Sequence, residues 1–110
     1  MSTRNTVRDI GDLYEDGTPI TMVTCYDFTF ARLVDQADID AVLIGDSLGN
    51  VVQGETTTLP VMLEDIIYHT RAVVRGASQA HVIADMPFMS YQADPVEGVR
   101  NAGRLLKEGG

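Results

Sequence analysis

The order of hydrophobic periods constrains the fold of this sequence more than any other feature. An apolar run rich in β-branched residues, 19–26, is followed by a segment with helical spacing, residues 27–37. Two further strand patterns, at residues 41–45 and 81–84, are each followed by another helical pattern. Consecutive strand–helix units are joined by right-handed crossovers, which place their strands in one parallel sheet. The sequence therefore predicts an α/β protein.

The second predicted helix has the strongest signal. We expect it to open at Pro60, with acidic residues in its first turn, arginines in its last turn and Gly76 directly after its end. Its apolar stripe consists of Met62, Leu63, Ile66, Ile67, Thr70, Val73 and Val74. Because the stripe, the charges and the end signals agree, this helix is expected to pack one face against the sheet.

The other two helices are predicted from similar signals. Asp27 precedes the first helix as a candidate N-cap, and the expected buried face is Phe30, Leu33, Val34 and Ala37. The last helix has Asp94 as N-cap, Pro95 in the first turn and Glu97 at capping-box spacing. Its expected buried face is Val99, Ala102, Gly103 and Leu106.

Three parallel strands cannot close a barrel by themselves. The chain is therefore either a small open sheet or the first three βα units of a (β/α)8 TIM barrel, a fold of about 250 residues. We favour the truncated barrel, with residues 1–110 forming the N-terminal part of a single barrel domain.

Composition narrows the classes of partner. The formal net charge is −8, with eleven Asp and five Glu against seven Arg and one Lys. No basic cluster is present to release counterions from a nucleic acid or to bind an anionic membrane, so neither partner is expected. A small molecule or another protein is expected instead. The imbalance fits either a salt-adapted source or an ordinary acidic enzyme.

The expected location is the cytoplasm. The N-terminus has no apolar leader segment, and no apolar run approaches the ~20 residues that cross a bilayer. The single cysteine, Cys25, has no partner for an intrachain disulfide, which fits a reducing compartment.

Two aspartates follow successive predicted strands directly. Asp46 comes after residues 41–45, and Asp85 comes after residues 81–84. Because adjacent strands lie ~4.8 Å apart, side chains at their carboxyl ends can converge on one cation. Carboxylates are the ligands that Mg²⁺ prefers, so the pair predicts a metal site. Each aspartate could instead cap a loop, and Asp27 could either join the pair or cap its helix.

The segment between the second strand and its helix, residues 46–59, is unusually long. A βα loop at the strand C-terminal edge is where ligands bind in α/β sheets, so it is a candidate lid. It contains no Gly-Lys-Ser/Thr step and no Gly-x-Gly-x-x-Gly, so a nucleotide-phosphate site is not indicated. Tyr26 is placed at the mouth of the same edge, whereas His69 and His81 are expected to be structural.

The chain resembles the ketopantoate hydroxymethyltransferase family from about residue 4 onward. Four ordered motifs carry the resemblance: residues 23–27, 42–49, 58–61 with 67–73, and 85–91. It implies a (β/α)8 barrel in a homo-oligomer, commonly a decamer. The implied reaction transfers a hydroxymethyl group from 5,10-methylenetetrahydrofolate to 3-methyl-2-oxobutanoate and gives 2-dehydropantoate, a step of pantothenate biosynthesis.

The resemblance also assigns roles to residues. Asp46 and Asp85 match the magnesium ligands of the family, and Asp46, Ser47 and Asp85 match positions that contact the 2-oxo acid. Ser47 could alternatively be only a turn residue. The general base and a substrate-binding lysine belong to later strands, beyond Gly110, so no catalytic residue is expected here and the chain alone is expected to be inactive.

Two other classes of protein stay open. One is a related metal-dependent barrel enzyme that forms an enolate, such as a phosphoenolpyruvate mutase or isocitrate lyase relative. The other is a noncatalytic open-sheet binding module. The segment 85–91 and the Thr-Leu-Pro step at 58–60 favour the hydroxymethyltransferase over the first of these.

Overall fold

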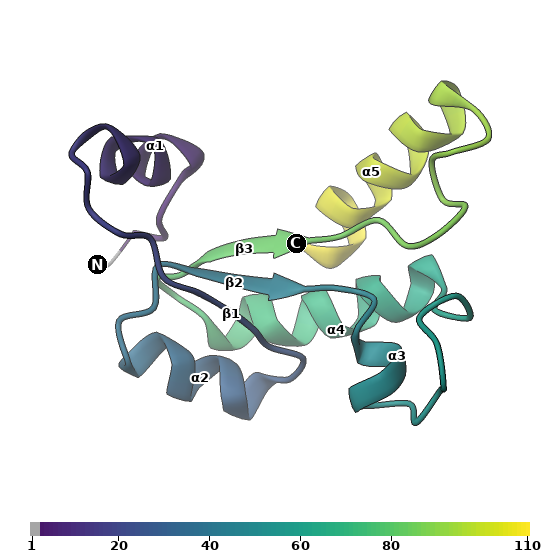
Figure 1. Ribbon diagram of the computed structural model, residues 1–110, viewed down its shortest axis with the longest axis horizontal. Helices are drawn as coiled ribbons and strands as arrows, with labels where there is room; N and C mark the ends of the chain where they lie inside the picture. The colour runs from purple at the N-terminus through teal and green to yellow at the C-terminus, as the bar shows by residue number, and fades with distance from the viewer. Residues whose placement is uncertain (1–2) are drawn as a thin grey trace.

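Three parallel strands and five helices make up the chain in the computed structural model, which describes residues 3–110 (Figure 1). Their bounds in chain order are α1 Val7–Glu15, β1 Met22–Thr24, α2 Phe28–Gln36, β2 Ala41–Ile44, α3 Leu48–Val51, α4 Leu63–Gly76, β3 His81–Ala84 and α5 Pro95–Gly109. The predicted α/β class and all three strand–helix units are confirmed. None of the helices within residues 3–110 is long and apolar enough to cross a membrane.

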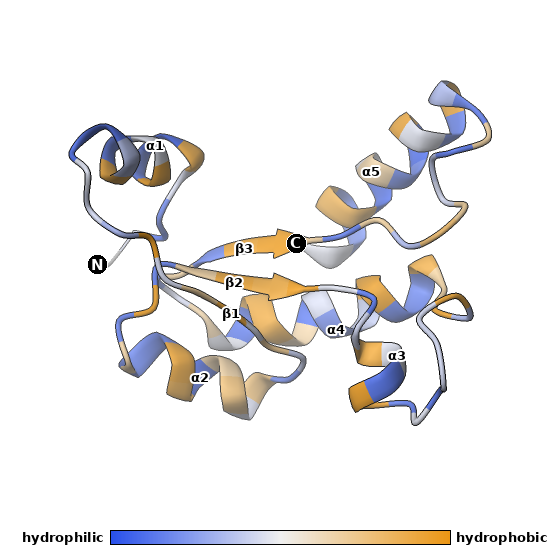
Figure 2. Cartoon of the chain, viewed as in Figure 1, coloured by the Kyte–Doolittle hydropathy of each residue, from blue (hydrophilic) through white to orange (hydrophobic). Residues whose placement is uncertain are grey.

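The sheet has the order β1–β2–β3, with both pairs parallel. Ala41 of β2 pairs with Met22 on one side and with His81 on the other. Figure 2 shows β2 and β3 as largely hydrophobic, as expected for strands that helices cover. Val42 and Ile44 are fully buried.

The prediction of a buried first strand over residues 19–26 is wrong in extent and in burial. Only Met22–Thr24 form β1, and all three residues are exposed, with Met22 at 56%. The physical reason is position, because β1 is an edge strand and α4 packs against β2 and the other edge strand, β3, rather than against β1. Its hydrophobic side chains therefore lack neighbours on the outer side.

Helix α4 packs against β2, β3, α2 and α5 and is the centre of the helical layer. Its predicted stripe is largely confirmed, since Leu63, Ile66, Ile67, Thr70 and Val73 are buried. The predicted start at Pro60 is wrong. The helix begins at Leu63, where the Asp65 carboxylate accepts from the Met62 backbone N–H at 2.9 Å. Gly76 is the last helical residue rather than the one after it.

The buried faces of α2 and α5, the two helices that flank α4, differ from the predicted ones. In α2, Phe30 and Leu33 are exposed and Ala31 is buried, because the helix contacts α4 at Gly76. In α5, Val99 and Leu106 are exposed and Leu105 is buried. The predicted caps Asp27 and Asp94 are confirmed, but the Asp94 carboxylate accepts from Val96 and forms no capping box with Glu97.

Two helices were not predicted. Helix α1 is capped by Thr6, whose hydroxyl accepts from the Asp9 N–H while the Asp9 carboxylate accepts from the Thr6 N–H. Helix α3 interrupts the predicted loop 46–59 for a single turn directly after the second strand. Figure 1 shows α3 near the carboxyl ends of the strands, whereas α1 lies near their amino ends.

Asp35 joins the end of α2 to the turn before β3. Its carboxylate accepts from the Ser78 N–H at 3.0 Å, the Ser78 hydroxyl at 2.8 Å, the Gln79 N–H at 3.0 Å and the Ala80 N–H at 2.9 Å. Burial raises the pKa of this carboxyl, but the hydrogen bonds outweigh burial and hold the pKa below its ordinary value. The ionised form therefore positions β3.

Asp35→Asn is expected to destabilise the protein by about 1 to 2 kcal/mol at pH 7, since hydrogen bonds to a charged acceptor are lost from a partly exposed site. A depressed pKa stabilises the fold above the unfolded-state value of about 3.9, and this contribution disappears as pH falls through the folded-state pKa. Thermal midpoints at pH 7 and pH 3 measure it. The difference from the parent should shrink at pH 3, whereas Asp12→Asn on exposed α1 should change little at either pH.

Candidate metal centre

The carboxyl ends of β2 and β3 bring Asp46 and Asp85 together. Ile44 pairs with Ala84, and the Asp85 N–H donates to the Ile44 carbonyl at 2.9 Å, so the two chains leave the sheet side by side. Both aspartates line one open cavity of about 490 Å³ with Met86 and Tyr91. The juxtaposition expected from the sequence is therefore present, while the role of the pair as metal ligands stays a prediction.

Gly45 makes room for the Asp85 carboxylate. A Cβ atom at Gly45 would lie 3.2 Å from Asp85 Oδ2 and 3.8 Å from Leu43 Cγ. The distance to the carboxylate oxygen is shorter than an ordinary van der Waals contact between carbon and oxygen. A glycine at the end of β2 thus lets a carboxylate from β3 lie over the neighbouring strand, toward Asp46.

The electrostatics of the pair favour a cation. Burial raises the pKa of Asp85, and the negative charge of Asp46 raises it further. Within residues 3–110 neither side chain has an ion-pair or hydrogen-bond partner from the protein; the ion pairs found there join Arg104 to Glu64 and to Glu108. Two carboxylates that share a cavity without a counter-charge are stabilised when a cation binds between them.

The donor set fits magnesium better than a metal that needs a protein cage. No group of three or more His, Cys, Asp or Glu side chains positioned to hold a metal occurs in the described part of the chain. Mg²⁺ commonly takes one or two carboxylates and completes its octahedron with water and substrate oxygens. Asp46 and Asp85 are the residues that would hold it.

Ser47 follows Asp46, but it is not among the residues that line the cavity. It precedes α3 at the N-cap position, yet its side chain makes no capping hydrogen bond. Its hydroxyl is hydrogen-bonded to the Tyr26 hydroxyl instead. Asp27 is not among the residues that line the cavity, and its carboxylate caps α2 by accepting from the Phe30 N–H at 2.8 Å.

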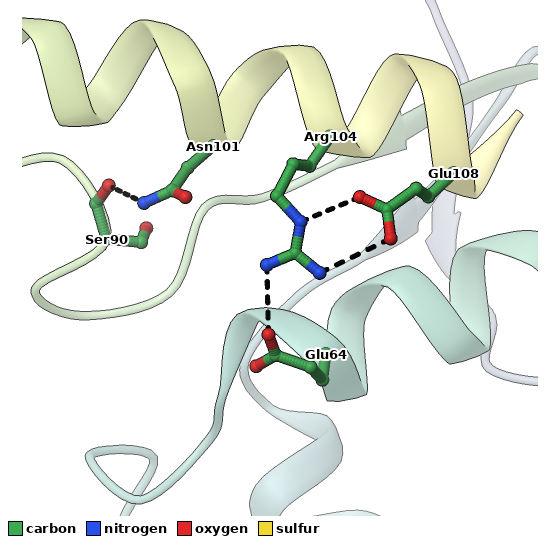
Figure 3. A network of polar contacts seen from close by, with 5 residues as sticks. All are labelled: Glu64, Ser90, Asn101, Arg104 and Glu108. Atoms are coloured by element: carbon green, nitrogen blue, oxygen red, sulfur yellow. Dashed lines mark hydrogen bonds and ion pairs between the residues drawn. The ribbon is translucent and has the colours of Figure 1, made fainter.

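Tyr91 lines the cavity, although its sequence context predicted no role for it. It lies in the loop between β3 and α5, which is tied to α5 by Asn101 donating to the Ser90 carbonyl at 2.6 Å (Figure 3). The sequence signal that could have identified Tyr91 is its place in the segment 85–91, which begins with the strand-end aspartate Asp85. Glu108 is not among the residues that line this cavity; Arg104 binds it at 2.7 Å between α5 and α4 and also pairs with Glu64 of α4 (Figure 3).

Both histidines contact backbone carbonyls, and neither lines the cavity of Asp46 and Asp85. His69 Nδ1 lies 2.7 Å from the Tyr26 carbonyl, and His81 Nδ1 lies 3.0 Å from the Asn5 carbonyl. A carbonyl only accepts, so Nδ1 carries the proton in each ring. Cys25 is a buried core residue.

A parallel α/β sheet with paired carboxylates at its carboxyl edge is typical of enzymes that bind a divalent cation there. The family of ketopantoate hydroxymethyltransferases matches residues 4–110, and the chain belongs to this family.

Curated relatives agree with the family match. Proteins named 3-methyl-2-oxobutanoate hydroxymethyltransferase are 53% identical over 105 residues in Leptospira biflexa serovar Patoc (strain Patoc 1 / Ames) and 54% identical over 110 residues in Geotalea daltonii. The match covers 96% of this chain and 39% of the relative in the first case, and 100% and 41% in the second. The chain therefore spans about two fifths of the length of these relatives.

Proposed function

We propose that the polypeptide carrying this chain transfers a hydroxymethyl group from 5,10-methylenetetrahydrofolate to 3-methyl-2-oxobutanoate, giving 2-dehydropantoate for pantothenate biosynthesis. One observation carries the proposal: Asp46 and Asp85 share a cavity without a counter-charge from residues 3–110, within a segment that matches the family throughout. Membership of this family disfavours the other enolate-forming barrel enzymes and the noncatalytic module.

The chemistry requires removal of the C3 proton of the 2-oxo acid and stabilisation of the resulting enolate. A magnesium ion, when bound, supplies positive charge to the 2-oxo and carboxylate oxygens of the substrate. Asp46 and Asp85 would bind that magnesium ion at the strand ends, and Ser47 would donate a hydrogen bond from its hydroxyl to the substrate. The general base and a substrate-binding lysine are assigned to the remainder of the protein, beyond Gly110, so this segment binds and orients.

Wider features follow from the same proposal. Residues 1–110 are the first part of a single (β/α)8 barrel domain, in which β1 and β3 gain further neighbours. We propose a cytoplasmic location and a homo-oligomer, the assembly that the resemblance to the family implies. Within residues 3–110, β3 pairs with β2 alone, and a largely apolar cavity of about 450 Å³ lies beside it, lined in part by His81, Ala84 and Leu105. Space of this kind next to an edge strand supports a further strand there.

The test is a chimaera in which this chain replaces the matched segment of the Geotalea daltonii relative. We expect the purified chimaera to form 2-dehydropantoate from 3-methyl-2-oxobutanoate in a reaction that requires magnesium and 5,10-methylenetetrahydrofolate. The unaltered relative is the positive control.

A folded chimaera without activity contradicts the proposal. A second chimaera exchanges only residues 41–91, from β2 to the loop after β3, so that both Asp46 and Asp85 come from this chain. If the first chimaera does not fold, the activity of the second chimaera tests the proposal.

A further inference from the structure

The hydroxyl of Ser47 has a partner that local structure does not explain. Serine at the N-cap of a helix ordinarily accepts from a backbone N–H of the first turn. Ser47 precedes α3 but makes no such bond, and its hydroxyl is hydrogen-bonded to Tyr26, which follows β1. The contact joins residues 21 positions apart across the carboxyl edge of the sheet. It therefore serves the orientation of Ser47 rather than the end of the helix.

Either hydroxyl of this pair could be the donor. A phenol is a better hydrogen-bond donor than an aliphatic alcohol, so we take Tyr26 to donate and Ser47 to accept. The Ser47 hydroxyl then keeps its own proton to donate elsewhere. Ser47 does not itself line the cavity, but its sequence neighbour Asp46 does, so a substrate bound there would receive this proton on the side of the cavity next to α3.

Helix α4 also contacts Tyr26, through His69. His69 of α4 donates from Nδ1 to the Tyr26 carbonyl at 2.7 Å, and the two rings meet edge to face with centroids 6.5 Å apart. Tyr26 is half-buried against the core. Its backbone and its hydroxyl are thus both fixed, one by α4 and the other by Ser47.

We propose that Tyr26 is a positioning residue, held by His69, that orients the Ser47 hydroxyl so that its proton is donated to the 2-oxo acid. This inference rests on the proposed function and adds two residues to its binding machinery. Neither Tyr26 nor His69 is expected to touch the reacting atoms.

The variants Tyr26→Phe, Ser47→Ala and their combination test the inference in the active chimaera. Tyr26→Phe removes only the hydroxyl, and we expect kcat/KM for the 2-oxo acid to fall about tenfold, mostly through KM, because one oriented hydrogen bond to a charged ligand is weakened. The magnesium concentration that gives half-maximal rate should not change. The double variant should be no worse than Ser47→Ala alone, because both changes remove one interaction.

Tyr14→Phe is the matched control. Tyr14 is 76% exposed on α1, and no hydrogen bond to its hydroxyl is found within residues 3–110, so the same chemical change should leave KM unaltered. His69→Ala should raise KM in the same direction as Tyr26→Phe, and His69→Asn, which keeps a donor near Nδ1, should restore it.

Losses that add in the double variant, or a fall in thermal midpoint with unchanged KM, would overturn the inference while leaving the proposed function intact. Equal KM values for His69→Ala and His69→Asn would show that the hydrogen bond from His69 does not help to position Tyr26. A folded but inactive parent chimaera counts against the proposed function itself, and this inference falls with it.

Discussion

Asp46→Asn and Asp85→Asn are each expected to reduce magnesium-dependent exchange of the substrate C3 proton into deuterated water by about 10²-fold or more, because an electrostatic stabiliser of a developing oxyanion is removed. Asparagine keeps the size and one acceptor oxygen of aspartate but loses the charge that holds the cation. Proton NMR of the chimaera with 3-methyl-2-oxobutanoate and magnesium measures the exchange rate without the folate co-substrate.

The double variant distinguishes a shared ion from two separate effects. If both carboxylates act through one cation, the losses should not add, and the double variant should resemble the worse single variant. Asp12→Asn, which makes the same change on exposed α1, should exchange at the parent rate. Near-native exchange in either single variant would mean that the cation is held elsewhere.

Gly76→Ala is expected to cause the largest loss of stability from a single methyl group, about 3 kcal/mol, at the upper end for overpacking. A Cβ atom there would lie 2.6 Å from the Phe28 carbonyl oxygen and 2.8 Å from Ala31 Cβ. Both contacts belong to α2, and a backbone oxygen cannot move without moving the helix. The α2–α4 contact would therefore have to open.

The matched control for that change is Gly11→Ala in α1, where nothing lies within 4 Å of the added atom. Alanine has a higher helix propensity than glycine by about 1 kcal/mol, so this variant should be unchanged or more stable. Thermal midpoints followed by circular dichroism compare the two. Equal midpoints for Gly76→Ala and the parent would show that α2 and α4 adjust without cost.

Local patterns predicted the elements that are covered on both sides or that carry strong end signals. The run before Asp46 and the stripe of α4 are buried as expected, because β2 lies between two strands and α4 packs against the sheet. Burial of β1 could not be predicted, since it depends on what lies beyond the strand edge. Helix α1 was missed, although Thr6 and Asp9 form a recognisable capping box.

The candidate site divides in the same way. Asp46 and Asp85 could be found from the sequence, because Asp85 directly follows β3, Asp46 follows β2 after Gly45, and parallel strands end at one edge. The hydrogen bond between Tyr26 and Ser47 could not be predicted, because it joins residues of two βα units and depends on the path of the chain into α3. Tyr91 reaches the cavity only through the path of the loop before α5.

The most direct test of a cation shared by Asp46 and Asp85 is the position of the cation itself. Manganese can replace magnesium in oxygen-rich sites and gives an anomalous X-ray signal that magnesium lacks. Crystals of the chimaera grown with Mn²⁺ and 3-methyl-2-oxobutanoate are expected to show one anomalous peak within about 2.0 to 2.3 Å of a carboxylate oxygen of both Asp46 and Asp85, the range for such ligands. A peak that touches neither aspartate, or only one of them, would contradict the account.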